Sequence, residues 1–339
     1  MNSPSFRRCP DCHVENIRFD YEYNTTSNGC RKMFLCRDCG ASFSETKNTF
    51  LAGIKKPAST IWSAINARTE GVSLNATCRV FDIARNTLLL WERKFNAIYH
   101  TLLIYSMAHA YIEMVIEGDE FYTKVNKNVP PEESEGWTIV LMDRATRFIF
   151  EISCGKKDES FFRKAVETLA QLVEQTDDIT LLTDGERRYG SILFEICHEI
   201  IRTGKPGRPR KTLKKGVTVR VKNKGSQKHK KGPKKPKYQT TCPRHPETAN
   251  NISDEETHAN HVEANNGAMR RKCSAFRRKT NTYAKSKTSL QRVLNIYWVV
   301  HNFVRVHFTT KEVPAVGLGI MKRGFTPQGL FNIQLMQPL

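Results

Sequence analysis

The chain has 339 residues, which is enough for two or three domains of ordinary size. Hydrophobic residues make up 39% of the sequence, so a wholly disordered chain is excluded. No apolar run reaches the length of a membrane span, and the first ten residues, MNSPSFRRCP, lack the apolar core of a secretory signal. We therefore expect a non-secreted protein with no membrane partner, in which the ten cysteines serve as metal ligands or free thiols.

Positive charge dominates the sequence and is concentrated in one segment. The chain has 54 Lys and Arg against 34 Asp and Glu, a formal net charge of +20. The segment 202–237 holds sixteen of the basic residues and no acidic one. Such a block repels itself, so we expect it to stay outside the core unless a polyanion lies beside it. Nucleic acid is the favoured polyanion, because the segment has no apolar face for lipid; a solvated loop without a specific partner is the alternative.

A short string within this segment resembles a minor-groove binding motif. Arg208 and Arg210 flank Pro209 in a Gly-Arg-Pro-Arg sequence like that of an AT-hook. Two such arginines could lie in a narrow minor groove. Basic strings with proline also arise by chance.

Two CxxC pairs near the N-terminus predict a zinc site. The four cysteines are Cys9, Cys12, Cys36 and Cys39, with 23 residues between the pairs. Zinc prefers four tetrahedral thiolate ligands, and each CxxC presents two sulfurs from one tight turn. We therefore expect residues 1–50 to form a zinc ribbon whose Zn²⁺ is structural, with all four positions filled. Gly40 follows the second pair, where the turn needs a residue that tolerates positive φ.

Two other interpretations of these cysteines were weighed against zinc. The string CPDCH at 9–13 also matches a c-type haem attachment site, but that chemistry needs an exported setting and leaves the second CxxC unexplained. Cys30 lies outside both pairs and is interpreted as a spare thiol.

Residues 55–100 predict a helix-turn-helix. The helical stretches are 57–68, 74–81 and 84–99. Ser73 is a favourable N-cap for the second of them. In a helix-turn-helix the last helix enters the major groove of double-stranded DNA. Its candidate DNA contacts are Arg85, Asn86 and Lys94; a helical linker without DNA contact is the alternative.

Residues 108–310 have the pattern of a mixed α/β domain, a sheet flanked by helices. Strands are predicted over 115–125, 137–142, 147–153 and 179–183, and helices over 159–175, 186–202 and 257–278. Three consecutive strands, a helix, a fourth strand and then helices is the element order of a ribonuclease-H-like domain. In this interpretation 202–240 is a basic insertion and 311–339 is a C-terminal tail.

Three acidic residues fall where this fold could bring them together. Asp119 is in the first strand, Asp184 directly follows the fourth, and Glu263 is near the start of the long helix. Two divalent ions held by carboxylates from separate elements activate the attacking oxygen and stabilise the leaving one in phosphodiester chemistry. We therefore predict a Mg²⁺ or Mn²⁺ site. Glu120 is the alternative to Asp119, because neighbouring side chains alternate between the faces of a strand.

The long helix supports the choice of Glu263. Polar and basic side chains share its face at helical spacing: Asn260, Asn266, Arg270 and Arg277. Of these, the two arginines are candidate DNA contacts. His258 and His261 flank Glu263 but project away from its face, and we interpret them as capping, phosphate-contacting or packing residues. Asp143, at a strand end, is interpreted as a turn residue that caps Arg144 or Thr146.

Several strings carry a resemblance to a known family. They are CPDC, CRDC, GDEFYTKV, LLTDGERRYG and HANHVEANNGAMRRKCSAFRRKTNTYAKS, and they extend from about Cys9 to about His307. The chain resembles transposases of the insertion-sequence-one type, DDE recombinases preceded by a zinc ribbon and a helix-turn-helix. The resemblance implies that Asp119, Asp184 and Glu263 form the DDE triad and that Mg²⁺ is the catalytic cofactor.

The resemblance also implies a reaction and its partners. Such enzymes hydrolyse a strand at terminal inverted repeats and then use the freed 3′-hydroxyl to attack target DNA. This implies double-stranded DNA as the partner, a homo-oligomer on DNA and, for a prokaryotic source, a cytoplasmic, nucleoid-associated location. Two other functions remain open: a non-catalytic DNA-binding protein derived from a transposase, and a structure-selective nuclease on the same fold.

Overall fold

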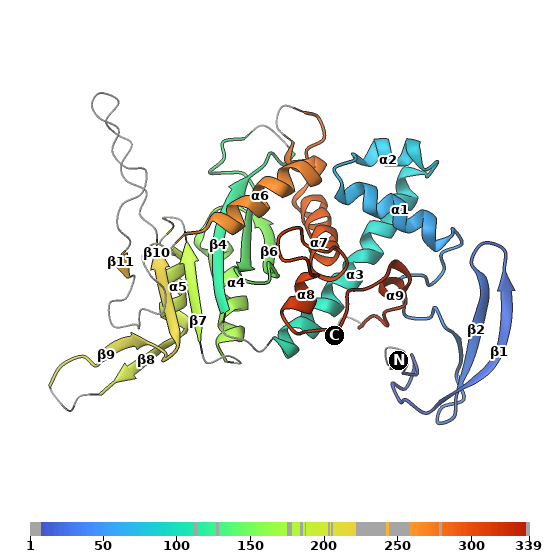
Figure 1. Cartoon of the computed structure of the whole chain (residues 1–339), viewed down its shortest axis with the longest axis horizontal. Helices are drawn as coiled ribbons and strands as arrows, with labels where there is room; N and C mark the ends of the chain where they lie inside the picture. Colours follow the sequence, from blue (N-terminus) through green and yellow to red (C-terminus); the bar gives the residue numbers. More distant parts are fainter. Residues whose placement is uncertain are drawn as a thin grey trace. The chain divides into compact units, whose positions relative to one another are not determined.

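The computed structural model describes residues 8–110, 114–126, 129–174, 178–183, 186, 188–202, 204, 206–221, 242–243, 258–277 and 280–336. The chain divides into two compact units (Figure 1). The first combines the residues up to Ile104 with those from Phe325 onward, and the second spans Tyr105–Gly324. Within the described ranges, no helix is both long and apolar enough to cross a membrane.

The first unit begins with a three-stranded antiparallel sheet in the order β1-β2-β3. Its strands are β1 (Ile17–Thr25), β2 (Gly29–Cys36) and β3 (Ser42–Ser44). Gly29 has a φ of +67° and closes the turn between the first two strands. The small buried core of this sheet consists of Cys9, Cys36 and Phe43. Because two of these three residues are cysteines of the CxxC pairs, the apolar core alone is too small to hold the module together.

Three helices follow, and the third of them extends beyond Ile104, where the first part of this unit ends. They are α1 (Ala58–Thr69), α2 (Leu74–Val80) and α3 (Arg85–His109). The Ser73 hydroxyl accepts the Ala76 amide and caps α2, as predicted. Arg68 of α1 and Glu92 of α3 form a buried ion pair at 2.8 Å that joins the two helices. The third helix is longer than the predicted 84–99, because the apolar periodicity continues into the segment after it.

The C-terminal segment packs instead of forming the tail expected over 311–339. The short helix α8 (Pro314–Gly317) belongs to the second unit, and α9 (Pro327–Phe331) belongs to the first. Phe331 is fully buried and stacks on Phe50 with 4.5 Å between ring centroids. Such short helices contain too few turns to give a periodic sequence pattern, so the sequence alone did not indicate them.

The second unit is built on a six-stranded mixed sheet in the order β11-β10-β7-β4-β5-β6. The strands are β4 (Met114–Tyr122), β5 (Trp137–Asp143), β6 (Ile149–Gly155), β7 (Ile179–Thr183), β10 (Val217–Val221) and β11 (Cys242–Pro243). β4, β5 and β6 are antiparallel, whereas β7 runs parallel to β4 and β10 runs parallel to β7. The predicted mixed α/β sheet flanked by helices is confirmed.

Helices cover both faces of this sheet and one of its edges. They are α4 (Glu159–Val173), α5 (Arg188–Ile196), α6 (Asn260–Lys272), the 3-10 turn η1 (Ser274–Phe276) and α7 (Lys287–Phe303). α6 packs against β4 on one face, and α4 and α5 lie on the other (Figure 1). Side chains of α7 bond the backbone of β6: Gln291, Trp298 and Asn302. The hydrogen-bonding groups at this edge of the sheet are thereby satisfied.

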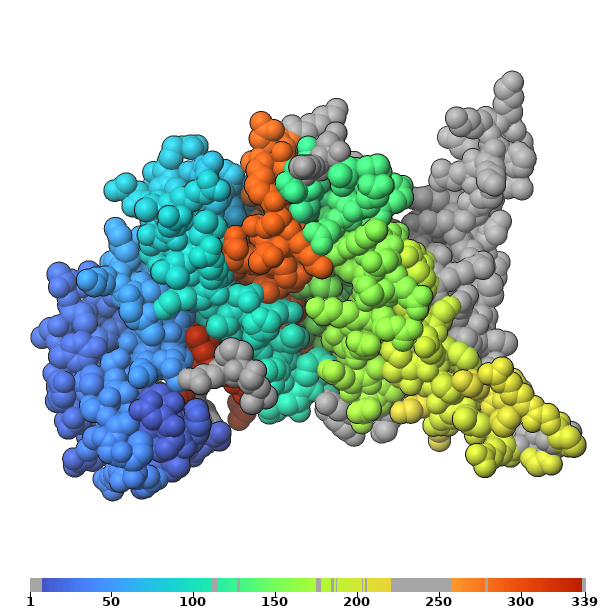
Figure 2. All heavy atoms as spheres, turned by 180° about the vertical axis from the view of Figure 1, so that it is seen from behind, coloured from blue at the N-terminus to red at the C-terminus, as the bar shows by residue number. Residues whose placement is uncertain are grey.

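Part of the basic segment lies inside the fold, contrary to the expectation for 202–240. β8 (His198–Ile201) and β9 (Arg210–Leu213) form an antiparallel hairpin that projects from the second unit (Figure 2, yellow). β10 is a strand of the main sheet, with Val217 and Val219 buried. Its Val-Thr-Val-Arg-Val sequence alternates as a strand should, and the high basic content obscured this pattern. Residues 222–241 lie outside the described residues.

The helix predicted over 186–202 is also shorter in the structure. α5 ends at Ile196, and the chain enters β8 two residues later. The reason is the pairing of residues 198–201 of β8 with residues 210–213 of β9. Such pairing overrides local helix preference, so the sequence pattern misplaced the end of this helix.

Candidate functional site

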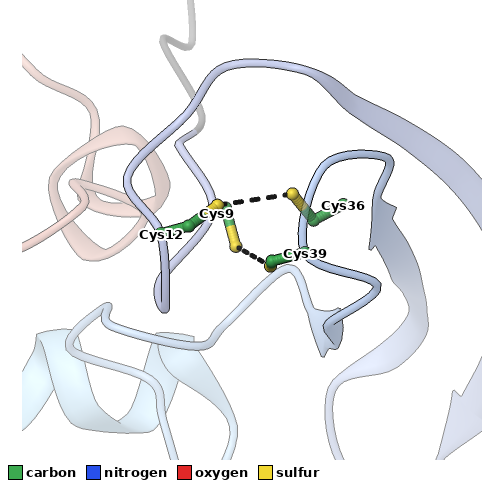
Figure 3. A group of neighbouring side chains, drawn as sticks. All are labelled: Cys9, Cys12, Cys36 and Cys39. Carbon is green, nitrogen blue, oxygen red and sulfur yellow. Dashed lines mark hydrogen bonds between the residues drawn. The ribbon is translucent and has the colours of Figure 1, made fainter.

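The four cysteines of the CxxC pairs converge (Figure 3). Their Sγ atoms all lie within 4.8 Å of one another. The Sγ atoms of Cys9 and Cys39 are 3.5 Å apart, as are those of Cys12 and Cys36, and all four thiols are free. Four thiolates about 2.3 Å from a tetrahedral zinc ion would be separated by about 3.8 Å. The cluster therefore has the donor set and the size to bind zinc.

Two similar turns present these sulfurs. In each, the residue after the second cysteine donates its amide to the carbonyl of the first: His13 to Cys9 at 2.9 Å, and Gly40 to Cys36 at 3.1 Å. Both donors have positive φ, +61° for His13 and +73° for Gly40. The prediction for Gly40 is confirmed. The histidine of the CPDCH string thus has the same backbone role in the first turn as the glycine in the second.

Cys9 and Cys12 differ in pKa, partly because the four thiols lie close enough to form hydrogen bonds with one another. Burial raises the pKa of Cys9, but hydrogen bonds from the amides of Cys12 and Asp11 outweigh this effect. The net result is a pKa of about 7. The Val14 amide lowers the pKa of Cys12, but burial and the other three thiols raise it to about 12. A bound cation would replace the protons that remain on the cluster. Cys30 stays outside the cluster and donates to Glu22 at 3.2 Å.

Asp119 and Glu120 point to opposite faces of β4. Asp119 faces α6, where the Asn266 amide group donates to Oδ2 at 2.8 Å. Glu120 faces the other side: its Oε1 is 2.6 Å from Lys157 Nζ, and its Oε2 accepts the Tyr189 hydroxyl at 3.3 Å. Lys157 neutralises Glu120. For Asp119, the structure shows no ion pair with a described residue.

Glu263 is exposed in the first turn of α6. Burial and the charge of Glu120 are the largest causes that raise the pKa of Asp119, and the charge of Glu263 adds to them. The Asn266 amide lowers this pKa, but the net value is about 6. Asp184 lies outside the described residues. β7 ends at Thr183, which pairs with Gly118, the neighbour of Asp119.

α6 is shorter than the helix predicted over 257–278. It ends at Lys272, because Cys273 is extended and η1 follows. Arg270 is on α6, with its guanidinium 5.3 Å from the centre of the Phe121 ring. Arg277 is exposed beyond η1, so it does not share a helix face with Glu263 as predicted.

The structure brings together a second group of side chains of the types that bind metals, which the sequence did not indicate. One of them lies on β4, two residues before Asp119. It consists of Glu117, His258 and His261. The Glu117 side chain is fully buried, and its Oε1 is 2.7 Å from both Arg144 Nε and His261 Nδ1. Its Oε2 accepts the amides of His261 and Val262 at 3.0 and 2.9 Å. Because Arg144 occupies the place of a cation, this group is a charged helix cap and not a metal site.

The surroundings of Glu117 lower its pKa. Burial raises it, but hydrogen bonds from His261, the Val262 amide and Arg144 lower it more. The sequence contained a signal for this residue, because Glu117 and Asp119 are two apart and so share one face of a strand. Asp143, by contrast, accepts the amide and hydroxyl of Thr146 at 2.7 Å, which confirms its interpretation as a turn residue.

The candidate DNA contacts differ in their surroundings. Arg85 and Asn86 are exposed in the first turn of α3, and Arg208 and Arg210 are exposed around the start of β9. Lys94 is half-buried, and its ammonium donates to the carbonyls of Phe50 and Ala52. The interpretation of Lys94 as a DNA contact is therefore corrected: this side chain holds the turn that precedes α1.

Comparison with known proteins adds no relative to this description: no protein-family model matches the chain, and no significant match is found among curated proteins.

Proposed function

We propose that the chain is a DDE transposase of the insertion-sequence-one type, the family that its sequence resembles. It would cleave DNA strands at terminal inverted repeats and join the freed 3′-hydroxyl to target DNA. Asp119, Asp184 and Glu263 would be the acids that hold the Mg²⁺ or Mn²⁺ ions. The argument rests on the sequence strings given above and on the described residues around β4 and α6.

The observation that carries the proposal is the position of Asp119 beside α6. Its side chain is half-buried, burial and the charges of Glu120 and Glu263 raise its pKa, and no described residue neutralises it with an ion pair. Two carboxylates from a strand and a helix offer the hard oxygen ligands that Mg²⁺ prefers. A divalent cation would relieve the repulsion between them, so the residues present fit such an ion.

Asn266 would hold Asp119 in the orientation that the reaction needs. Its side chain donates to Oδ2 of Asp119 at 2.8 Å. With a pKa of about 6, the carboxyl group is mostly ionised at neutral pH. A metal ion bound here would activate the attacking oxygen and stabilise the leaving one.

The order of elements in the second unit supports the same proposal. β4, β5, β6, α4 and β7 follow one another along the chain. This is the order expected of a ribonuclease-H-like domain, with the second acid directly after the fourth of its strands. Thr183 at the end of β7 pairs beside Asp119, so the chain leaves the sheet next to the proposed site.

The first unit would read double-stranded DNA. A structural Zn²⁺ held by the four cysteines would stabilise the small sheet as a zinc ribbon. α1, α2 and α3 would form a helix-turn-helix, with the exposed Arg85 and Asn86 entering the major groove. Joining two DNA ends favours a homo-oligomer, and a prokaryotic source would place the protein at the nucleoid in the cytoplasm.

Cleavage and joining of DNA that carries the element's own ends would test the proposal. We expect Mg²⁺-dependent cleavage with joined products from wild type, lost roughly a thousandfold or more in Asp184→Ala and Glu263→Gln, because metal ions supply several kcal/mol of transition-state stabilisation. Glu159→Gln is the matched control, since Glu159 is also an exposed glutamate in the first turn of a helix.

The two alternative functions predict different products. Binding without cleavage in Mg²⁺ or Mn²⁺ would contradict the proposal and leave a non-catalytic DNA-binding protein. Cleavage that depends on DNA structure and gives no joined product would leave a nuclease.

A further inference from the structure

α6 contacts one face of β4 at successive levels. Glu117 meets the first turn of α6, Asp119 meets Asn266, and Phe121 meets Arg270. Two residues of a strand advance about 6.8 Å, and four residues of a helix advance about 6.0 Å. The spacings of the two elements therefore match, so the helix runs along the strand, and Glu263 lies between the first and second of these contacts.

The first contact is unusual because the helix is capped from another element. The N-cap residue of α6 is Ala259, whose methyl side chain cannot accept a hydrogen bond from the first turn. Glu117 instead accepts the amides of His261 and Val262 with one oxygen, at 3.0 and 2.9 Å. Amides in the first turn of a helix have no partner within the helix, so this carboxylate fixes where α6 begins relative to β4.

Arg144 makes this buried cap possible. Its Nε is 2.7 Å from Glu117 Oε1, and its Nη2 donates to the His258 carbonyl at 2.5 Å. The guanidinium thus compensates the buried carboxylate and holds the residue that precedes α6. An uncompensated carboxylate at a fully buried position would be costly, so Glu117 and Arg144 act together.

We propose that Glu117 is a positioning residue that sets Glu263 opposite Asp119. It does not touch the ion itself; it fixes the start of α6, and Asn266 fixes the next turn against Asp119. Glu263 is thereby held between two anchored levels although its own side chain is exposed. The proposal rests on the proposed function, in which Asp119 and Glu263 bind a divalent cation together.

Mn²⁺ binding by the full, zinc-loaded chain tests this role. Free Mn²⁺ is measured by its electron paramagnetic resonance signal during titration of wild type, Glu117→Gln and Glu151→Gln, together with amide hydrogen exchange over α6. Glu151 is the matched control, because it is a buried glutamate on β6 whose carboxylate accepts the Thr168 hydroxyl of α4. It therefore faces a different helix.

We expect Glu117→Gln to weaken Mn²⁺ binding about tenfold or more, as is typical when a residue that orients a metal ligand is lost. Amide exchange over 260–272 should be faster in the same variant. Glu151→Gln should change neither quantity. A Mn²⁺ titration of folded Glu117→Gln that superimposes on that of wild type would overturn the proposal.

Failure of the proposed function gives a different result. If wild type binds no Mn²⁺ outside its zinc site, the proposed metal site is overturned, and with it the purpose assigned to Glu117. If amide exchange over α6 is unchanged in Glu117→Gln, the role of Glu117 in fixing the helix is overturned as well. If Glu117→Gln does not fold, Glu117→Asp is measured in its place. This variant keeps the negative charge on a side chain that is one methylene shorter. We expect the same two changes at smaller size, and wild-type values for both would overturn the proposal.

Discussion

Glu117 and Asp119 lie two residues apart on the same face of β4 and both contact α6, yet their charges are balanced differently. Glu117 accepts four hydrogen bonds, among them those from Arg144 and His261, and its pKa is lowered. Asp119 accepts hydrogen bonds from Asn266 and from the Glu120 amide, but burial and its acidic neighbours raise its pKa to about 6. The comparison shows that the residue types around a carboxylate, more than its burial, separate a structural acid from a candidate metal ligand.

The cysteine cluster brings four possible metal ligands together. We expect Cys39→Ala to reduce bound zinc from one ion per chain to none and to unfold the sheet of β1 to β3, because structural zinc contributes roughly 10 kcal/mol to the folding of such modules. Metal analysis and limited proteolysis check this. Cys30→Ala is the control and should keep its zinc; zinc retained at wild-type affinity in Cys39→Ala would contradict the assignment.

Neutralising the two carboxylates of β4 should have opposite effects on stability. Glu117→Gln removes one partner of a buried ion pair and should lower the free energy of unfolding by about 3 kcal/mol. Asp119→Asn removes a charge that its surroundings disfavour, and should leave the free energy of unfolding unchanged or higher when Mg²⁺ and Mn²⁺ are absent. Urea unfolding of both variants measures these changes. Equal losses in the free energy of unfolding would contradict the difference that we draw between Glu117 and Asp119.

The pH dependence of unfolding sharpens the same comparison. The folded pKa of Asp119, about 6, is above its unfolded value of 3.8, so wild type should lose about 2 kcal/mol relative to Asp119→Asn as pH rises from 4 to 6. The folded pKa of Glu117 is below 4.5, so its contribution is present above pH 4.5 and is lost as pH falls below that value. If the free energy of unfolding of both variants changes with pH in the same way as that of wild type, these two predictions are contradicted.

The smallest expected difference concerns two basic residues of α3. Arg85→Ala should weaken DNA binding and reduce the slope of log affinity against log salt by about 1, because a positive charge that would neutralise a phosphate beside the major groove is lost. Lys94→Met should keep DNA affinity but lower stability by about 1 kcal/mol, since its ammonium holds two backbone carbonyls. Binding titrations at several salt concentrations, with thermal unfolding, measure both. A larger loss of DNA affinity in Lys94→Met would reverse the assignment.

Much of the fold could be predicted because its elements have local patterns. The strand 179–183 and the cap at Ser73 follow from alternation and capping chemistry, and both are found as predicted. The convergence of the four cysteines followed from the requirements of zinc. What was missed depends on contacts distant in sequence, such as the pairing of β10 with β7 and the packing of Phe331 on Phe50.

In the candidate site, too, local sequence patterns predicted some features, whereas others depend on contacts between residues distant in sequence. Alternation on a strand placed Asp119 and Glu120 on opposite faces, and helical spacing placed Asn266 near Glu263. The sequence could not show that Arg144, 27 residues after Glu117, pairs with it, or that Lys94 turns toward the carbonyls before α1. Both outcomes depend on which oppositely charged or polar group lies nearest in space.

Cleavage by Asp119→Asn, compared with wild type and Glu120→Gln, tests the central claim most directly. Each variant removes one negative charge from neighbouring residues of β4, and Mg²⁺-dependent cleavage of DNA bearing the element's ends is measured. We predict that Asp119→Asn, although folded and no less stable than wild type, loses cleavage, whereas Glu120→Gln keeps most of it. Cleavage at the wild-type rate by Asp119→Asn would show that the uncompensated carboxylate of β4 is not part of the catalytic metal site.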